Sequence, residues 1–469
     1  MAVVLHSGVV VRAFAVRFVD LRLAALALLA IGCSTSSDKA PASSAGAPST
    51  PDSTAAAAAA AACPGGRAEL TLPAGFCATV FAEGIERARH VTVASNGDVY
   101  TTIDGTGRPD PTRPAPAPVS FVALRDTNHD GKADIIARVG ALGNTGIGLF
   151  GGYLYVDEGT RVVRYSRPDT QLVPSAAAEV VVDRLPLAPG HRARNFAIGS
   201  DSALYLNVGS ATNSCQTKDR VNDSPGVDPC TELLTRAGIW KFSATKRNQH
   251  FGTSSRFATG IRNGMGIAIA ADGRLYATQH GRDQLHDNWP TTFPDAKYQA
   301  ENPAEQLMQV NKGDDFGWPY CYYAVDEKKL VNAPEYGGDG KKAERCSSRK
   351  APLAAFPGHW APMSLLFYTG STFPAKYRNG AFIAFHGSWN RAPEQQAGYR
   401  VVFQPLADGA IGGAYETFAD GFAGLPPAEI QPGTAKHRPM GLATAPDGAM
   451  IITDDKGGRI YRVTYGAGR

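Results

Sequence analysis

The chain has 469 residues, and its 47 Lys and Arg residues only slightly outnumber its 43 Asp and Glu residues, so the formal net charge is +4. The basic residues are spread along the chain without a Lys/Arg block, so no nucleic acid is expected as a partner. The length suffices for one large β domain or two ordinary domains. The 51 Gly and 32 Pro residues are typical of many short strands joined by tight turns.

Residues 1–33 have the pattern of a signal peptide. Three arginines precede the apolar run LAALALLAIGC, which is too short to span a membrane and ends in small residues before Cys33. The last five residues of this run resemble a bacterial lipobox. We therefore expect an exported protein, periplasmic or attached to the cell envelope, that touches the membrane only through a lipid on Cys33. Ordinary secretion with a chance cysteine is the alternative.

Residues 34–62 are mainly Ser, Ala and Pro and have no periodic apolar face, so they are expected to be a flexible tether. The folded domain is then residues 63–469. Six cysteines lie beyond Cys33, and an even number in an exported protein suits disulfides. Proximity along the chain predicts the pairs Cys63 with Cys77, Cys215 with Cys230, and Cys321 with Cys346.

One sequence pattern recurs along the domain: a turn followed by a short run of residues that favour a β-strand. Asn-Gly and Asp-Gly between apolar segments are strong hairpin signals because Asn and Gly accept positive φ. Six copies predict an all-β fold, a six-bladed β-propeller with long inserted loops, and two β-sandwich domains are the alternative. The copies are ASNGDVYTT (94–102), FGGYLYVDE (150–158), GSDSALYLNVG (199–209), AADGRLYATQ (270–279), YRNGAFIAFHG (377–387) and APDGAMIITDD (445–455).

Cationic residues recur just before these runs, at the same position of successive repeats. In a propeller this position would converge near the central channel, where several arginines are costly unless an anionic or carbonyl-rich ligand neutralises them. A ring of solvated turn charges is the alternative. The residues are Arg89 before the first copy, His191 and Arg194 before the third, Arg262 and Asn263 before the fourth, and Arg438 before the sixth.

The segment DTNHDGKAD (126–134) has the side-chain spacing of a calcium-binding loop. Its candidate ligands are Asp126, Asn128, Asp130 and Asp134. The twelfth position is Ala137 instead of the usual bidentate Glu, so the pattern is incomplete. A structural calcium site and a plain Asp/Asn/Gly turn are both compatible with it.

Several motifs together resemble the glucose/sorbosone dehydrogenase family, the soluble-type sugar dehydrogenases that use pyrroloquinoline quinone (PQQ). The resemblance covers about residues 65 to 466 and is nearest to the L-sorbosone dehydrogenase-like branch. It implies a six-bladed propeller, in agreement with the repeats. The motifs are GHRAR, FATGIRNGMGIA, YATQHGRDQL, DDFGWPYCY, FHGSWNR, GYRVV and RPMGLATAPDGAMIITDD.

The resemblance implies a quinoprotein oxidoreductase that oxidises a sugar or a sugar-derived aldehyde, either an aldose or a sorbosone-like compound. His191 matches the general base, which takes the hydroxyl proton while hydride passes to PQQ. A neutral imidazole suits that role at neutral pH. A calcium ion, held partly by the main-chain carbonyls of Gly281 and Arg282, would bind and polarise the cofactor. No haem motif occurs in the chain, so an external cytochrome or quinone is expected to accept the electrons.

The remaining matches concern cofactor binding, because PQQ is a flat tricarboxylate that arginines can hold by charge-assisted hydrogen bonds. Arg262 and Asn263 match the pair that contacts the quinone, and Arg438 matches a carboxylate-binding arginine. Arg194 would orient the site or bind cofactor, and Arg89 belongs to the same group of cations.

The chain departs from the family at two positions. Met440 stands where soluble glucose dehydrogenases have a second arginine, and 388–391 (Ser-Trp-Asn-Arg) stand where they have a lysine, for which Arg391 could substitute. These departures leave two alternatives open. One is a non-catalytic propeller that binds carbohydrate or an envelope protein, and the other is a propeller lactonase, which the cation-rich loops disfavour. Substrate choice would come from the inserts 103–118, 214–236 and 284–304.

Overall fold

The computed structural model describes residues 63, 66–105, 119–187, 189–387 and 389–466. The chain divides into two units, residues 1–51 and residues 52–469, and every described residue lies in the second. The predicted signal peptide and tether therefore lie outside the described residues, as does most of the insert 103–118. No helix among the described residues is long and apolar enough to cross a membrane.

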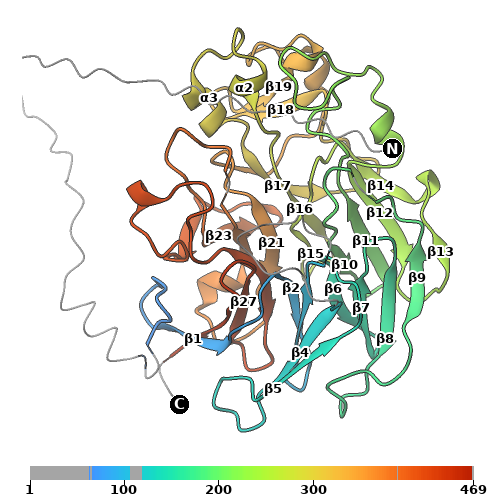
Figure 1. Ribbon diagram of the computed structural model, residues 1–469, viewed down its shortest axis with the longest axis vertical. Helices are drawn as coiled ribbons and strands as arrows, with labels where there is room; N and C mark the ends of the chain where they lie inside the picture. The colour runs from blue at the N-terminus through green and yellow to red at the C-terminus, as the bar shows by residue number, and fades with distance from the viewer. Residues whose placement is uncertain (1–62, 64–65, 106–118, 188, 388, 467–469) are drawn as a thin grey trace, which may run out of the picture. The chain divides into compact units, whose positions relative to one another are not determined.

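The described residues form six antiparallel sheets arranged as the blades of a β-propeller, as the repeats predicted (Figure 1). From the innermost strand outward, the first blade consists of β2 (Ala88–Val93), β3 (Val99–Ile103), β4 (Phe121–Arg125) and β5 (Ile135–Val139). The second consists of β6 (Ile147–Phe150), β7 (Tyr153–Asp157), β8 (Val162–Ser166) and β9 (Glu179–Asp183), and β13 (Gln249–His250) pairs in parallel with β9. The third consists of β10 (Phe196–Ile198), β11 (Ala203–Val208), β12 (Gly238–Ser243) and β14 (Arg256–Thr259). The fourth blade consists of β15 (Ile267–Ile269), β16 (Leu275–Gln279), β17 (Glu305–Val310) and β20 (Ala354–Phe356). The fifth consists of β21 (Pro362–Phe367), β22 (Gly380–Phe385) and β23 (Arg400–Ala407), and β23 pairs with both β24 (Ala410–Ile411) and β25 (Glu416–Ala419). The sixth consists of β26 (Pro439–Thr444), β27 (Met450–Asp454), β28 (Ile460–Tyr465) and β1 (Phe76–Ala82).

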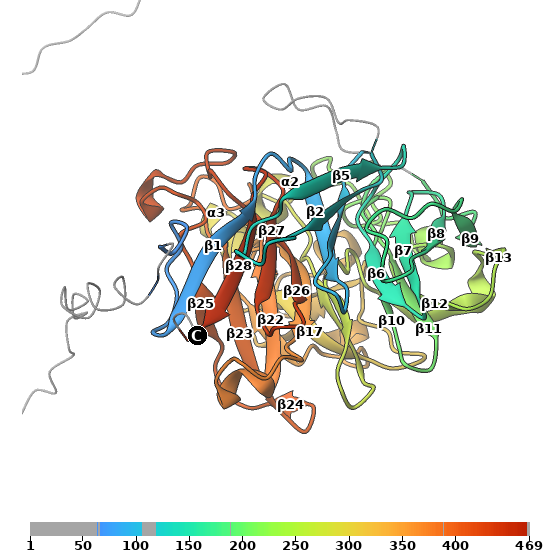
Figure 2. The same cartoon turned by 90° about the horizontal axis from the view of Figure 1, so that it is seen from below.

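The innermost strands close into a ring. Each contacts its neighbours in the order β2, β6, β10, β15, β21, β26 and back to β2. The last blade combines strands from distant parts of the chain, because β1 pairs antiparallel with β28, with Phe76 opposite Tyr465 and Ala78 opposite Val463 (Figure 2). This pairing joins the beginning of the described domain to its end.

Each of the six sequence repeats forms the second strand of a blade together with the turn that precedes it. In the last repeat, for example, Gly448 adopts a φ of +84° in the turn between β26 and β27. A residue with a Cβ atom is strained in this conformation, which explains the Asp-Gly signal.

The hydrophobic core is divided among the six contacts between neighbouring blades. Trp240 of β12 packs with Tyr155 of β7, and Met308 of β17 packs with Ile239 of β12. Most strands are thus buried on both faces, which explains why their sequences are almost continuously apolar. At the start of three inner strands, Met265, Met363 and Met440 pack together with Ala193 beside them.

The longest insertions lie together beside the third and fourth blades, around α2, α3 and the hairpin β18–β19 (Figure 1). The three disulfides join the predicted pairs, and two of them, Cys215–Cys230 and Cys321–Cys346, lie in this region. The short elements are α2 (Leu285–Asn288), α3 (Ala296–Glu301), β18 (Cys321–Ala324), β19 (Lys329–Asn332), and the 3-10 helices η1 (Thr231–Leu234), η2 (Thr253–Ser255), η3 (Pro334–Tyr336), η4 (Glu344–Cys346), η5 (Ala375–Arg378) and η6 (Pro427–Glu429).

Candidate functional site

The antiparallel blades gather the predicted site residues at one end of the ring. Because β15 and β16 are antiparallel neighbours, the residues before β15 and those after β16 lie at the same end of the fourth blade. Arg262 and Asn263 precede β15, and 280–283 follow β16. His191 lies in the equivalent loop before β10. Its main-chain N–H donates to the carbonyl of Ser210, whose own N–H donates to the carbonyl of Arg262.

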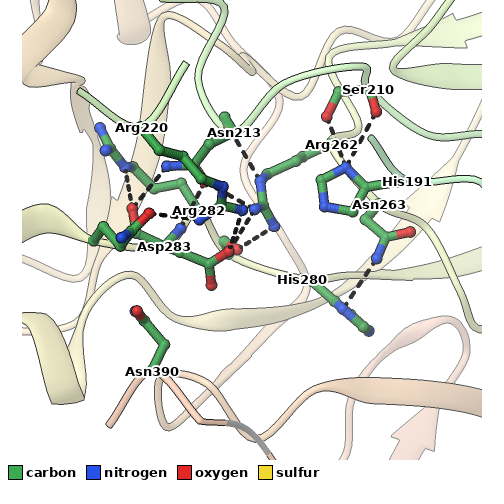
Figure 3. Close-up of polar contacts among 12 residues, drawn as sticks. His191, Ser210, Asn213, Arg220, Arg262, Asn263, His280, Arg282, Asp283 and Asn390 are labelled. Atoms are coloured by element: carbon green, nitrogen blue, oxygen red, sulfur yellow. Dashed lines mark hydrogen bonds and ion pairs between the residues drawn. The ribbon is translucent and has the colours of Figure 1, made fainter. Parts of the chain in front are cut away.

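His191 is held in one orientation by Ser210 (Figure 3). Nδ1 of the ring lies 2.9 Å from Oγ and 3.2 Å from the carbonyl oxygen of Ser210. The Ser210 hydroxyl donates its proton to the carbonyl of Thr212 at 2.6 Å, so it can only accept from the imidazole. His191 therefore carries its proton on Nδ1, which leaves a lone pair on Nε2.

The charge state of His191 suits a base. Burial and the nearby charge of Arg262 hold the pKa of His191 well below its ordinary value, so the ring is neutral at neutral pH. Nε2, which faces away from Ser210, is then the basic atom of the imidazole.

Arg262 is a buried anchor in the same cluster. Its Nε and Nη2 donate to the main-chain and side-chain oxygens of Asn213 at 3.1 and 2.8 Å, and Nη1 donates to the carbonyl of Gly281 at 2.7 Å. Nη2 also donates to Asp283 at 2.9 Å. These four bonds fix the guanidinium and leave one N–H of Nη1 for a ligand, counting partners among the described residues only.

Asp283 and Arg220 were not predicted from the sequence, although they belong to the same cluster as the predicted Arg262. Oδ2 of Asp283 accepts from Arg220 and Arg262, both at 2.9 Å. Burial opposes the charge of this carboxyl, but Arg262 and Arg220 outweigh it and hold its pKa well below the ordinary value. The signal was present, because Asp283 follows the predicted pair Gly281 and Arg282 in the motif HGRDQ.

Asn263 contacts a second histidine. Its side-chain nitrogen lies 3.1 Å from Nδ1 of His280, and Nε2 of that ring lies 3.0 Å from the carbonyl of Pro362. Oδ1 of Asn263 is buried and has no hydrogen-bond partner among the described residues. The site therefore contains an unsatisfied acceptor beside the cationic cluster, which is the kind of atom that a ligand completes.

The loop of Gly281 and Arg282 is tightly fixed. The Gly281 N–H donates to the buried carboxyl of Glu305 at 3.1 Å, and burial raises the pKa of Glu305 to about 8. A Cβ atom on Gly281 would lie 2.7 Å from Cγ of Pro303. The Arg282 side chain points to Glu335, with both carboxylate oxygens 2.6 Å from Nη1. The main-chain carbonyls of this loop are therefore held in place.

These residues fit an anionic quinone better than they fit a metal alone. Arg220, Arg262 and Arg282 pair with Asp283 and Glu335, and Asp219 lies 3.9 Å from Arg220, so an anionic ligand would meet the donor that these pairs leave over, the remaining N–H of Arg262. Among the described residues, no group of three or more His, Cys, Asp or Glu side chains is placed to hold a metal. A calcium ion at this loop would therefore need main-chain carbonyls and oxygen atoms of its ligand.

Two of the arginines predicted to bind cofactor or to orient the site, Arg194 and Arg391, are bonded to main-chain carbonyls of the protein. Arg194 is buried, and its guanidinium donates to the main-chain carbonyls of Gly159 and Pro186. Arg391 donates to the main-chain carbonyls of Ala300, Gly358 and Gln395 and to the carboxylate of Glu301. Both side chains tie loops together, because each guanidinium donates to main-chain carbonyls of more than one segment.

Arg89 and Arg438 lie with a different set of residues, where the sixth blade meets its neighbours. Arg89 donates to Asp455 at 3.1 Å, and the same carboxylate accepts from Nε2 of His386 at 2.7 Å. Arg438 donates to the main-chain carbonyls of His386 and Gly387. These two arginines thus meet through His386 at the same end of the ring. Met440, two residues beyond Arg438, is buried in the methionine cluster described above.

The predicted calcium loop forms a turn network of its own hydrogen bonds. The carboxylate of Asp126 accepts from the main-chain N–H groups of Asp130 and Gly131, and Asp134 accepts from Thr127 and Asn128. These bonds are those of an Asp/Asn/Gly turn, and calcium-binding loops also have such bonds, so the structural calcium site at this segment stays a prediction.

A family model described as TrAA12-like matches residues 70–466. An uncharacterized protein of Borreliella burgdorferi is 30% identical over 210 residues, which cover 44% of this chain and 48% of that protein. A pyrroloquinoline quinone-dependent pyranose dehydrogenase of Coprinopsis cinerea is 28% identical over 162 residues, which cover 31% of this chain and 21% of that protein. The chain thus matches less than half of the length of each of these relatives.

Solved structures share the fold. A Trichoderma reesei protein of carbohydrate-active enzymes family AA12 superimposes with a TM-score of 0.69 at 18% identity, covering 85% of this chain and 98% of that one. The holo form of the pyranose dehydrogenase PQQ domain from Coprinopsis cinerea gives a TM-score of 0.65 at 19% identity, covering 86% and 98%. At these identities the likeness establishes the propeller fold.

Proposed function

Because the chain belongs to the TrAA12-like family, we propose that it is a PQQ-dependent dehydrogenase that oxidises a sugar or a sugar-derived aldehyde. The relative from Coprinopsis cinerea is a pyranose dehydrogenase that depends on PQQ. The observation that carries the proposal is His191, a neutral base whose tautomer Ser210 fixes, beside a buried cationic cluster.

In this proposal the cofactor lies against Arg262 and the loop of Gly281 and Arg282. When bound, PQQ supplies the acceptor of the hydride, and a calcium ion shared with the main-chain carbonyls would polarise it. The remaining N–H of Arg262 faces an acceptor of the ligand, while Asn213 and Asp283 hold the guanidinium still. Fixed donors of this kind stabilise developing negative charge without reorganisation.

His191 performs the proton transfer. Nε2 takes the hydroxyl proton of the substrate while the carbon of the same C–O bond gives up its hydride, so one hydroxyl becomes one carbonyl. The imidazolium formed is stabilised through Nδ1–H by the Ser210 oxygens. The low pKa of His191 keeps Nε2 free of a proton before each turnover.

The export of the protein belongs to the same proposal. Three disulfides in the domain are expected of a chain that folds in an oxidising compartment. We propose a lipid anchor on Cys33 and an external electron acceptor, a cytochrome or a quinone. Mass spectrometry of the mature chain tests the anchor, because acylation adds the mass of the lipid to an N-terminal Cys33.

Reconstitution tests the activity. The purified chain is incubated with PQQ and calcium, and dye reduction is followed with aldoses and sorbosone. We expect turnover that requires both additions and that is lost in His191→Ala. Failure of the wild-type chain to turn over any substrate or to retain PQQ after desalting would contradict the proposal and favour a binding propeller.

A further inference from the structure

A cavity lies beside α3 and the turn of the hairpin β18–β19, in the region of the long insertions (Figure 1). Its volume is about 430 Å³, within the ~300–1,000 Å³ that ligand pockets span. The described residues that line it fall in the segments 292–302, 326–327 and 339–341, and none of them belongs to the cluster around His191 and Arg262. The insertions thus form a pocket with a wall of its own.

One side chain in this wall has an unused hydrogen-bond donor. Asn302 lines the cavity and is only 1% exposed. Its Oδ1 accepts from the main-chain N–H of Val325 at 2.7 Å, which fixes the amide because only its oxygen can accept. Nδ2 is the other end of that amide, and it is buried without a hydrogen-bond partner among the described residues. Such a donor is costly to leave unpaired, so it favours a ligand that brings an acceptor.

Two aromatic rings give the same cavity an apolar surface. Phe293 and Tyr298 both line it and are stacked, with ring centroids 4.6 Å apart and planes 8° apart. The main chain at Gly340 closely approaches both rings. A Cβ atom there would lie 2.8 Å from the hydroxyl oxygen of Tyr298 and 3.1 Å from Cε1 of Phe293. Glycine at this position therefore lets the two rings keep their place in the wall.

The charges in the wall balance one another. Among the described residues, five carboxylates line the cavity: Asp295, Glu301, Asp326, Glu327 and Asp339. Lys297 and Lys341 line it as well. Three more cations pair with wall carboxylates at 2.6–3.7 Å, in the pairs Arg391–Glu301, Lys329–Glu327 and Lys342–Asp339. Five negative charges thus meet five positive charges, so the wall offers many acceptors and no net charge.

A neutral ligand with several hydroxyl groups satisfies all three features. A hydroxyl oxygen accepts from Nδ2 of Asn302, hydroxyl protons go to the carboxylates, and the C–H face of a sugar ring packs on an aromatic ring. A metal ion or a simple amine brings no acceptor for Asn302. An anion would meet five carboxylates whose charge the protein has already balanced.

We propose that this cavity binds one unit of a neutral saccharide, at a second site that acts independently of the site of His191. The proposal goes beyond the proposed function, because it requires neither PQQ nor turnover. A carbohydrate that carries two suitable sugar units could engage both sites of one chain, which raises its effective concentration at each.

The first test measures sugar binding by saturation-transfer NMR, on the full chain with and without PQQ and calcium. The probes are D-glucose, D-galactose, D-mannose, D-xylose, cellobiose and maltose. We expect at least one of them to show a binding component that is present in both preparations. In Gly340→Ala this component should weaken at least tenfold, because the added Cβ atom displaces Tyr298 and Phe293.

The matched control is Gly337→Ala. Gly337 lies in the same loop and has almost the same backbone conformation, with a φ of +83° against +85° at Gly340. A Cβ atom on Gly337 would have no other atom within 4 Å, so this variant carries the backbone strain without touching the cavity. We expect it to bind sugar as the wild type does. Equal loss of binding in both variants would overturn the proposal, because backbone strain would then explain the effect.

Asn302→Asp tests the donor and does not depend on how Gly340→Ala folds. The substitution keeps an oxygen for the N–H of Val325 and replaces the Nδ2 donor by a second acceptor. Sugar binding should weaken about tenfold, measured at pH 9 so that the new carboxyl is ionised. Circular dichroism on heating checks that the variant is folded. Undiminished binding to a folded Asn302→Asp would contradict the proposed contact.

Crystals soaked in the best sugar of the panel locate the site directly. We expect density for one sugar unit beside Asn302 and Phe293, whether or not the chain turns over any substrate. The proposal is overturned if no sugar of the panel binds, or if density appears only beside His191. Spermidine binding that is lost in Gly340→Ala, without any sugar binding, would assign the cavity to a cation and would overturn it too.

Discussion

At the scale of single residues, function depends on which nitrogen of a ring carries the proton. Ser210 decides this for His191, because its hydroxyl is already committed as a donor to Thr212. The position of His191 before an inner strand can be predicted from the sequence. The tautomer cannot, because Ser210 lies on the next loop and its partner is a main-chain carbonyl.

The pH dependence of turnover should reflect the lowered pKa of His191. His191 acts as a base when it is neutral, so activity should persist as the pH falls and decline only well below the ordinary histidine value of about 6.5. The measurement is kcat/KM against pH for the wild type. An acidic limb at or above pH 6.5 would contradict the assignment of the base.

Replacing Ser210 tests how the base is oriented. Ser210→Ala removes the side-chain acceptor of Nδ1–H and leaves only the longer contact to the main-chain oxygen at 3.2 Å. We expect kcat to fall about tenfold with KM little changed, since the tautomer matters in the transition state more than in binding. Steady-state kinetics measures this split, and a change confined to KM would argue against an orienting role.

Residue identity alone does not show where the guanidinium groups of two predicted site arginines are bonded. Arg194 and Arg391 stand at positions typical of ligand-binding cations, but their donors go to main-chain carbonyls of distant loops, such as Gly159 and Ala300. The direction of a long side chain depends on which carbonyls lack partners after folding, and a single sequence does not contain that information. Asp283 was missed although it directly follows the predicted pair Gly281 and Arg282, because its ion pairs with Arg220 and Arg262 form only in the folded chain.

At the scale of elements, the sequence was more informative. The second strand of every blade could be predicted, because the turn before it requires Gly or Asn and its apolar run is buried on both faces. The family was also predicted correctly from the motifs at the ends of these strands. The hairpin β18–β19 and the short helices α2 and α3 were not predicted, since they are brief and are held by packing against one another.

The loop after β16 should tolerate no side chain at Gly281. A Cβ atom would lie 2.7 Å from Cγ of Pro303 and 3.1 Å from its main-chain oxygen, so Gly281→Ala must displace the loop and its carbonyls. We expect at least a tenfold loss of PQQ retention at a given calcium concentration, measured by absorbance after desalting. Gly252→Ala is the control, because Gly252 is extended and a Cβ atom added there would have no other atom within 4 Å. Equal losses in both variants would contradict the argument.

At the scale of the whole molecule, stability depends on the antiparallel pairing of β1 with β28, which closes the ring of blades and is called the seam below. Ala78 is fully buried opposite Val463, so Ala78→Asp places an unpaired charge in the core. We expect the free energy of unfolding to fall by about 3–5 kcal/mol, measured by denaturant titration. Thr79→Asp is the matched control, because Thr79 is only partly buried and pairs with Arg462. If Thr79→Asp destabilises the protein equally, the seam is not the cause.

The same seam sets the order in which the molecule can be completed during synthesis. Phe76 emerges from the ribosome before the strands of the first five blades, but its partner Tyr465 is made only after them. Five blades can form from consecutive strands, whereas the sixth has to wait for the last one, and closing such a long loop is slow. Until then the first strand has an unpaired edge and the ring stays open. A chain of this design cannot close its ring of blades before β28 has been made.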